Sequence, residues 1–363
     1  MLDKLCEKFR LYLDLSRMEA ARGPKTIPRV FLDLLLCRFL LNVGPENYML
    51  FSFRDKSYAE RSKFMLNPSM HRLQESVNPP EYRSLAYDKL EFYDYCCANR
   101  IDTPPVLATI DPESLGTGKV AMLNTKQGVI SFLAEREGEN LVIKSVNGAH
   151  GAGLYAISIK AGMVCDMADN SRLSIENFAS KILSDGTRYL VQPRLRSHDA
   201  FDVLVKDNAL TTMRIVTYVN SLGDVIVPYA LLKIPVGDNV SDNFGLGNLA
   251  CGIDLETGRL SNAFRWDKNS QSIEEFDSHP VTGEKFSEFY VPEWGLILNS
   301  TQLAAEKFLP LRTLGWDVAL TNENMYFLET NCTYEVNAYQ IVNKKGFRPE
   351  ALALFNDNGV GRL

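Results

Sequence analysis

Apolar residues recur at helical spacing through the first part of the chain. Leu5, Phe9 and Leu13 lie four residues apart, the interval that gathers side chains on one face of a helix. A second helical pattern covers residues 28–41, after a glycine-proline break. We therefore expect residues 1–80 to form a mainly helical N-terminal region, with one short strand at residues 48–53.

Beyond the proline-rich linker that ends this region, the pattern changes from helical to extended. A helix is expected at residues 87–96, and Ser174 is placed to cap another at residues 175–183. Short apolar runs bounded by turn residues predict strands. These runs are residues 141–144, 154–159, 189–192, 212–218 and 225–233. Mixed helices and strands of this kind predict an α+β fold.

Two further runs near the C-terminus predict a hairpin that carries oxygen ligands. Residues 316–320 and 325–328 are apolar around a polar turn. With the turn centred near residue 323, Asp317 lies opposite Glu329, and Asn331 follows on the same face of its strand. Carboxylate and amide oxygens suit Mg²⁺. The alternative is an ordinary solvent-facing pattern, but the apolar flanks of both acids indicate burial, which is costly for an unpaired carboxylate.

A glycine-rich loop separates the strands expected at residues 141–144 and 154–159. Glycines allow backbone N–H groups to turn toward an anion, and a lysine at the foot of the loop adds positive charge. A plain turn is the alternative. A P-loop is excluded, because a strand and not a helix follows the glycines. The residues concerned are Lys144, Gly148, Gly151 and Gly153.

Two basic residues stand among apolar ones in adjacent predicted strands, Arg214 and Lys233. A lone basic residue in a strand usually makes a surface salt bridge. Together with the acids near the C-terminus, both are instead expected to point into a site. His150 and His198 are candidate proton shuttles, although a plain hydrogen-bonding role is the favoured interpretation for each.

Bulk composition narrows the class of protein. The 363 residues exceed a single comfortable core, and a net charge of -6 gives no general footprint for nucleic acid. Seven scattered cysteines without metal-binding spacing, and no signal-like start, favour a reducing cytoplasm. Residues 30–41 are apolar but too short to cross a bilayer, which needs about 20 residues. Packing against the protein is the favoured role for this segment, and peripheral membrane contact is the alternative.

The order and spacing of several of these residues resemble the ATP-grasp superfamily over residues 85–340. The segment from residue 189 to residue 215 is most similar to its sugar-transfer associated branch. The resemblance implies an ATP-grasp fold, in which two α+β subdomains clasp ATP. The residues that carry it are Lys89, Lys144, the strand at 189–192, Arg214, Asp317, Glu329 and Asn331.

The resemblance also implies a division of the chain. After the helical region, residues 81–118 would hold a linker and the start of the ATP-grasp part. Residues 119–195 would form the lid subdomain with the glycine-rich loop, and residues 196–363 the C-terminal subdomain with the metal site.

Roles for individual residues follow from the same resemblance. Lys89 and Lys144 would contact phosphates or purine, and Asp317, Glu329 and Asn331 would hold Mg²⁺. The backbone of Leu190 and Val191 would meet adenine, with Gln192 touching the nucleotide. Some members carry an arginine two residues before the metal aspartate. Here that position is Gly315, so its role would pass to Arg214.

The function implied is an ATP-dependent ligase that joins a carboxylate to an amine through an acyl phosphate. A sugar acid or polysaccharide precursor is one expected acceptor, and Arg214 and Lys233 would orient the carboxylate and the transferred phosphate, under a closing stretch at residues 241–248. A small-molecule kinase and a catalytically idle nucleotide-binding module are the alternatives. The oligomeric state is left open, with a homodimer among the expectations.

Overall fold

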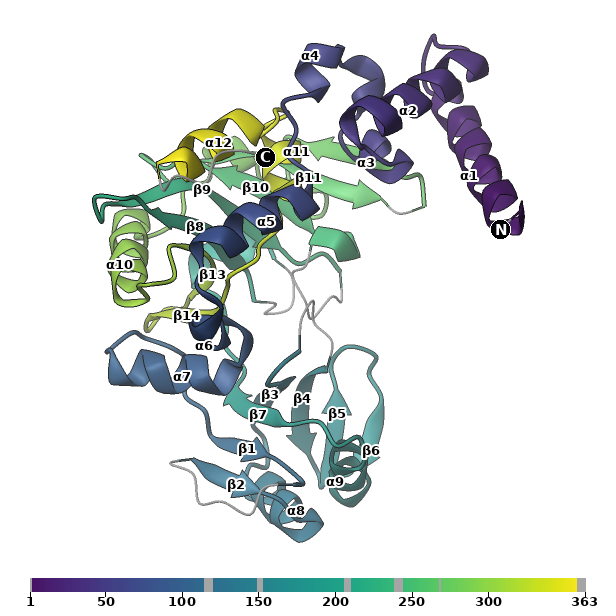
Figure 1. The fold of residues 1–363 in the computed structure, drawn as a ribbon. Coiled ribbons are helices and arrows are strands. Elements are labelled where there is room, and N and C mark those ends of the chain that lie inside the picture. The colour runs from purple at the N-terminus through teal and green to yellow at the C-terminus, as the bar shows by residue number, and fades with distance from the viewer. Residues whose placement is uncertain are drawn as a thin grey trace.

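A computed structural model describes residues 2–113, 120–148, 153–205, 210–237, 244–267 and 269–357. Two seven-stranded sheets dominate it, and a group of helices from the N-terminal region lies at one end (Figure 1). The fold is α+β, as expected. Residues 150, 151 and 241–243, which the sequence analysis assigned to a site, lie outside the described residues.

Within its described residues, the N-terminal region contains helices joined by turns and no strand. The expected strand at residues 48–53 is wrong: Tyr48 lies inside a helix, and Phe53 begins a 3₁₀ turn. Gly44 caps this helix and Pro45 occupies its first turn, and proline there is pre-set for helical geometry. The helices are α1 (Leu2–Ala21), α2 (Ile27–Leu41), α3 (Pro45–Leu50), α4 (Tyr58–Arg61) and α5 (Asn67–Val77), followed by α6 (Ser84–Tyr87) and α7 (Lys89–Ala98).

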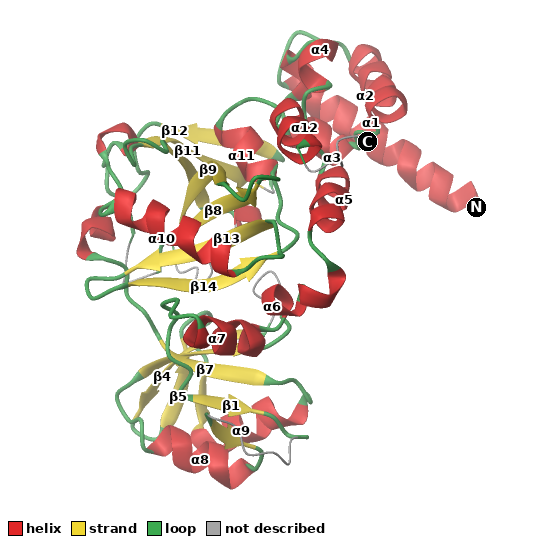
Figure 2. Cartoon of the chain, turned by 60° about the vertical axis from the view of Figure 1, so that its left-hand side comes forward, coloured by secondary structure: helices red, strands yellow, loops and turns green. Residues whose placement is uncertain are grey.

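The first sheet has the strand order β2-β1-β7-β3-β4-β5-β6. Among the described strands of this sheet, only the β1–β2 pair is parallel. Helices α8 (Lys126–Ala134) and α9 (Ile175–Ser184) pack on it and share its core (Figure 2), and Ser174 caps α9 as predicted. The strands are β1 (Ala108–Ile110), β2 (Ala121–Leu123), β3 (Asn140–Ser145), β4 (Leu154–Lys160), β5 (Met163–Asp166), β6 (Arg172–Ser174) and β7 (Tyr189–Pro193).

The second sheet is antiparallel, with the order β12-β11-β10-β9-β8-β13-β14. Its strands are β8 (Thr212–Val219), β9 (Val225–Ile234), β10 (Leu249–Ile253), β11 (Leu260–Asp267), β12 (Ser272–Phe276), β13 (Thr313–Leu320) and β14 (Met325–Asn331). Successive residues of a strand face opposite sides, and the two sides of this sheet support different cores. Ile215 packs in the core beneath α10 (Trp294–Lys307), whereas Val216 packs with α11 (Asn337–Val342), α12 (Arg348–Asn356) and the N-terminal helices.

Buried side-chain amides join the N-terminal helices to the second sheet. Gln74 exchanges two hydrogen bonds with the main chain of Tyr334, at 2.9 and 3.2 Å. Asn78 donates to the carbonyls of Thr313 and Cys332 and accepts from the Thr313 N–H at 3.0 Å. Because a buried polar group must be satisfied, these contacts fix where the helices sit on the sheet. In the part of the chain described, no helix combines the length and apolarity needed to cross a membrane.

Candidate functional site

A row of charged side chains crosses three neighbouring strands of the second sheet. Asp317 on β13 is paired in register with Arg214 on β8 and with Glu329 on β14. The predicted cross-strand position of Asp317 and Glu329 is therefore confirmed. Directly opposite residues in an antiparallel pair have neighbouring side chains, so the row gathers one cation and two carboxylates on one face.

Asp317 is buried and held by two cations. Arg214 donates to both carboxylate oxygens, from Nε at 2.8 Å and from Nη2 at 3.0 Å. Lys233 Nζ lies 3.2 Å from Oδ1 of the same carboxylate. Burial alone would raise the pKa of Asp317, but the charges of Arg214 and Lys233 hold that pKa well below its usual range. The carboxylate is therefore ionised at all physiological pH values.

The absence of a side chain at position 315 has a structural cause. A Cβ atom on Gly315 would come within 2.9 Å of Cβ of Tyr334, closer than such atoms approach. Tyr334 is buried, and its hydroxyl is 2.7 Å from that of Thr313. An arginine at 315 is thus excluded, and the guanidinium beside Asp317 comes from Arg214 on the next strand. The sequence analysis missed Tyr334, whose role depends on this close approach.

Two lysines connect the first sheet to the edge of the second. Lys89, the first residue of α7, donates to the carbonyl of Gly148 at 2.6 Å and lies 3.4 Å from Oε2 of Glu329. Lys144 on β3 reaches the carbonyl of Leu328 on β14, at 3.5 Å. The edge strand β14 lies on the side of the second sheet that faces α7 and β7 in both views (Figures 1 and 2). Both lysines therefore lie where the two sheets meet.

Among the described residues, this cluster brings four cations together with two carboxylates. Arg214, Lys233, Lys89 and Lys144 contact or face β13 and β14, against the carboxylates of Asp317 and Glu329. Burial lowers the pKa of Lys144 to about 8, although Glu329 acts in the opposite direction. A desolvated cationic cluster favours a polyanion such as a nucleotide phosphate chain.

The glycine-rich loop is described only at its two ends. The Gly148 carbonyl accepts the Lys89 ammonium, and Gly153 has a φ of +70°, a conformation that favours glycine. The Ser145 N–H donates to the Gly153 carbonyl at 3.0 Å and closes the foot of the hairpin. Gly151 and His150 lie outside the described residues, so phosphate binding by this loop stays a prediction.

Strand β7 lies in the interior of the first sheet. Leu190 and Val191 pair with both β1 and β3, and the Val191 carbonyl accepts the Leu107 N–H at 2.8 Å. Gln192 is buried and donates to the carbonyl of Pro104 at 2.8 Å. In the structure, Leu190 and Val191 are therefore paired within the sheet, and Gln192 is bonded to a loop carbonyl. The expected contacts of these residues with adenine and the nucleotide would compete with these bonds.

His198 acts as a local hydrogen-bonding residue. Its Nδ1 accepts the Ala200 N–H at 3.1 Å, and its backbone N–H donates to the carbonyl of Leu320 at 2.8 Å.

In the described end of the stretch at 241–248, Asn248 is buried and accepts the Val236 N–H at 3.0 Å. The sequence analysis also missed Asp88, which caps α7 and so positions Lys89. An aspartate directly before a helical pattern is a typical cap, and this feature of the sequence could have identified it.

The residues at the row fit a magnesium ion by chemistry. Asp317 and Glu329 offer carboxylates, and Asn331 is two residues beyond Glu329 on the same face of β14. Mg²⁺ would take the amide oxygen of Asn331, and its amide nitrogen, which is buried without a hydrogen-bond partner among the described residues, can donate to an oxygen of a bound ligand. No three His, Cys, Asp or Glu side chains within the described ranges form a metal cluster. A site with three protein ligands therefore requires the Asn331 amide in addition to the two carboxylates.

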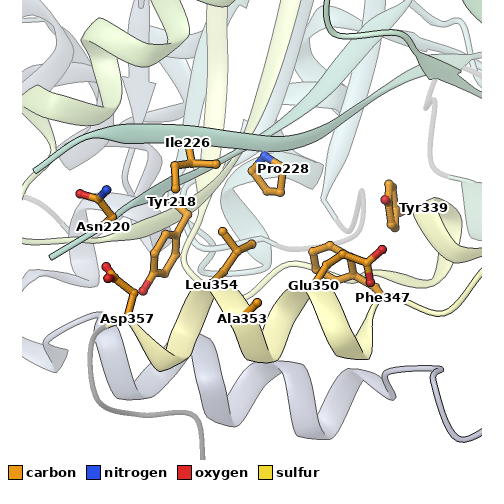
Figure 3. Close-up of a pocket in the computed structure, with 10 residues that line it drawn as sticks. All are labelled: Tyr218, Asn220, Ile226, Pro228, Tyr339, Phe347, Glu350, Ala353, Leu354 and Asp357. Carbon is orange, nitrogen blue, oxygen red and sulfur yellow. The ribbon is translucent and has the colours of Figure 1, made fainter. Parts of the chain in front are cut away.

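A separate surface cavity lies at the far end of β8 and β9. It has a volume of about 500 Å³ and is lined by apolar side chains such as Ile226, Pro228 and Leu354, with Glu350 and Asp357 at its edge (Figure 3). None of its lining residues belongs to the charged row or to the expected nucleotide site. The cavity therefore does not enter the chemistry of the site.

A family model described as sugar-transfer associated ATP-grasp matches residues 69–355. This match covers the charged row, both bridging lysines and the glycine-rich hairpin. No curated protein matches the sequence.

Three solved structures with similar folds are distant from this chain in sequence. N5-carboxyaminoimidazole ribonucleotide synthetase is 8% identical, with a TM-score of 0.41, 70% of this chain covered and 46% of that one. D-alanyl-alanine synthetase A from Vibrio cholerae is 13% identical, with a TM-score of 0.46 and coverages of 78% and 68%. The ATP-grasp ligase PsnB with a precursor peptide is 15% identical, with a TM-score of 0.39 and coverages of 85% and 69%. This chain thus spans less than half of the first protein's length.

Proposed function

The chain belongs to the sugar-transfer associated ATP-grasp family, and on that premise we propose that it is an ATP-dependent ligase joining a carboxylate to an amine. The observation that carries the proposal is the cationic cluster at the meeting of the two sheets. There, Arg214 and Lys233 hold Asp317, and Lys89 and Lys144 reach the strand that bears Glu329.

A carboxylate is a poor electrophile, so an amine cannot displace its oxygen directly. Transfer of the terminal phosphoryl group of ATP to a carboxylate oxygen forms an acyl phosphate and releases ADP. The amine nitrogen then attacks the acyl carbon, inorganic phosphate leaves with the bonding electron pair, and the nitrogen loses a proton to solvent. Phosphoryl transfer needs positioning and charge stabilisation more than covalent help from the protein.

The lysines and Arg214 supply that stabilisation in the proposal. Lys89 and Lys144 would bind phosphate oxygens with their ammonium groups. Arg214 uses Nε and Nη2 for Asp317, and its Nη1 makes no hydrogen bond with a described residue, so it can orient an incoming carboxylate or phosphate. Lys233 is fixed beside it through Asp317. Asp317, Glu329 and Asn331 would hold Mg²⁺, which neutralises phosphate charge when bound.

The acceptor in the proposal is a sugar acid or polysaccharide precursor, supported only by the family description. A cytoplasmic location is also part of the proposal. Its support is that all seven cysteines are free, as is usual for reducing compartments.

An ADP-release screen of uronic acids against amino acids and amines, with hydroxylamine present, tests the proposal. Hydroxylamine intercepts an acyl phosphate as a hydroxamate, so a ligase gives ADP and hydroxamate together. An acid-stable phosphorylated product formed without amine would indicate a kinase instead. Nucleotide binding without ADP release for any pair would favour an idle binding module.

Variants of the charged row distinguish ADP release by this protein from ADP release by a contaminating enzyme. Glu329→Gln keeps the size of a side chain that is one-third exposed, and we expect at least about a 100-fold loss of ADP release, because a neutral amide is a weaker ligand than a carboxylate for the Mg²⁺ that would be held here. Glu306→Gln, on the exposed side of α10, is the matched control and should turn over normally. Full activity of Glu329→Gln would refute the site.

A further inference from the structure

Helix α2 carries apolar side chains on two faces. Val30, Leu34 and Cys37 are buried against the rest of the protein. On the opposite side lies an exposed stripe, which we call the outer face of α2: Leu32 is 56% exposed, Leu36 47%, Phe39 81% and Leu40 60%. Spacings of four, three and one place these four side chains within one arc of the helix. Such a contiguous apolar patch marks an interaction surface.

The charged side chain within the arc of the stripe is a cation, Arg29, three residues before Leu32. Arg38 is also exposed but lies outside the arc, about 100° around the helix from Phe39, and its guanidinium donates to Asn42. The single acid of α2, Asp33, is taken up by other contacts: Arg61 donates to it at 2.6 Å, and Lys25 lies 3.3 Å away. Arg29 makes no ion pair with a described residue. The outer face therefore combines large apolar side chains with uncompensated positive charge.

We propose that the outer face of α2 docks the protein on an anionic lipid surface. An interfacial helix lies in the plane of the membrane, buries its apolar side among the acyl chains and uses basic residues to meet anionic headgroups. At 15 residues, α2 is too short to span a bilayer but long enough to lie on one. Helices α1 and α2 lie at the opposite end of the molecule from the first sheet (Figures 1 and 2), so docking leaves the meeting of the two sheets open.

A second copy of the chain fits this face less well. In a symmetric pair the same surface faces itself, so the cationic face with Arg29 would meet a like-charged face, with no exposed acid on α2 to compensate. An anionic bilayer supplies the missing negative charge. The net charge of -6 also repels such a bilayer elsewhere on the protein, which orients the molecule with α2 toward the lipid.

Vesicle co-sedimentation of the full chain tests the proposal. We expect binding to vesicles of equimolar phosphatidylcholine and phosphatidylglycerol, weakened by salt, and much weaker binding to phosphatidylcholine alone. Leu32→Gln with Phe39→Gln should reduce the partition coefficient at least about 10-fold, because two inserted side chains are lost. Arg29→Gln should weaken the preference for the anionic lipid, whereas Arg38→Gln, outside the outer face, should leave that preference unchanged.

The matched control is Leu296→Gln with Leu303→Gln. These leucines of α10 have the same spacing of seven residues and are 57% and 48% exposed, but Glu306 follows them on the exposed side. The control should bind vesicles as the unmodified protein does. Circular dichroism and urea unfolding must match for all variants. No vesicle binding, equal binding to both lipids, or a dimer in sedimentation velocity that only the α2 leucine-phenylalanine variant dissociates would overturn the proposal.

Discussion

Asp317 sets the charge balance of the proposed active site. Its carboxylate is the shared partner of Arg214 and Lys233, so it holds two partly buried cations close together. Removing one partner of a buried ion pair leaves the other charge desolvated and uncompensated. The same residue therefore matters for stability and for catalysis, and the two effects need separate measurements.

We expect Asp317→Asn to lower the free energy of unfolding by about 3 kcal/mol at pH 7, because Arg214 and Lys233 then repel each other without a carboxylate between them. Urea unfolding measures this. Adding Arg214→Met should recover part of the loss, since one of the two cations is removed with the acid. Asp14→Asn, from an exposed pair with Arg17, is the control and should have little effect. Equal stability of Asp317→Asn and the control would contradict the buried ion pair.

Lys144 makes nucleotide affinity depend on pH. Burial lowers the pKa of its ammonium to about 8, so the free protein loses this positive charge as the pH rises through 8, whereas below 7 it is fully charged. If Lys144 binds phosphate, the Kd for ATP should be about 10-fold higher at pH 9 than at pH 7. Isothermal titration calorimetry over that range measures the Kd and the protons taken up on binding.

Lys144→Arg is the informative control for this pH effect, because a guanidinium stays charged throughout the range. Its ATP affinity should be nearly flat from pH 7 to pH 9. A wild-type affinity that does not change with pH, or an unchanged slope in Lys144→Arg, would assign the phosphate contact to another residue.

The sequence predicted which residues belong to the charged row but not the partners of every site residue. The pairing of Asp317 with Glu329 follows from strand periodicity and a short turn, both local properties. Gln192 donates to the carbonyl of Pro104, 88 residues away, and no local pattern encodes that contact. The contribution of Arg214 required knowing that β8 lies beside β13.

At the scale of elements, strong local signals predicted structure well, and short apolar runs did not. The β13–β14 hairpin and the cap of α9 were predictable because turn residues and a serine cap fixed their ends. The segment at 48–53 has apolar residues suited to either structure. There, Gly44 and Pro45 at the helix start decided the outcome, which shows that end signals outweigh composition in a short run.

Strand β13 depends on the absence of a side chain at position 315. Gly315→Ala would place Cβ 2.9 Å from Cβ of Tyr334, so we expect a loss of about 1–3 kcal/mol in unfolding free energy from overpacking. Urea unfolding measures it. In Gly295→Ala, the same chemical change on α10 meets no atom within 4 Å and should raise stability by about 0.5 kcal/mol, because alanine favours a helix. Equal effects of both changes would refute the close packing of β13 against Tyr334.

At the scale of the molecule, the N-terminal helices and the second sheet share one core, while the first sheet has its own. The sequence could not predict this association, because the contacts that make it join residues far apart in the chain. Gln74 binds Tyr334 across 260 positions, and Asn78 binds Thr313 across 235. Such pairings depend on the whole arrangement of sheets and helices.

This division predicts two unfolding transitions. All three tryptophans, Trp266, Trp294 and Trp316, lie in or against the second sheet, so their fluorescence should follow only that part of the molecule. Far-UV circular dichroism should follow both parts. In urea, we expect a dichroism transition that the tryptophan signal does not report, because the first sheet buries a separate core.

One variant in each core decides between two transitions and one. Gln74→Ala leaves the Tyr334 main chain unsatisfied, so it should lower the stability of the fluorescent transition by about 2 kcal/mol although it lies in the N-terminal helices. Ile143→Ala, in the core of the first sheet, should cost about 3 kcal/mol and shift only the transition seen by dichroism. If both variants move one common transition, the two sheets unfold together, and the contacts of Lys89 and Lys144 then couple them more strongly than their separate cores imply.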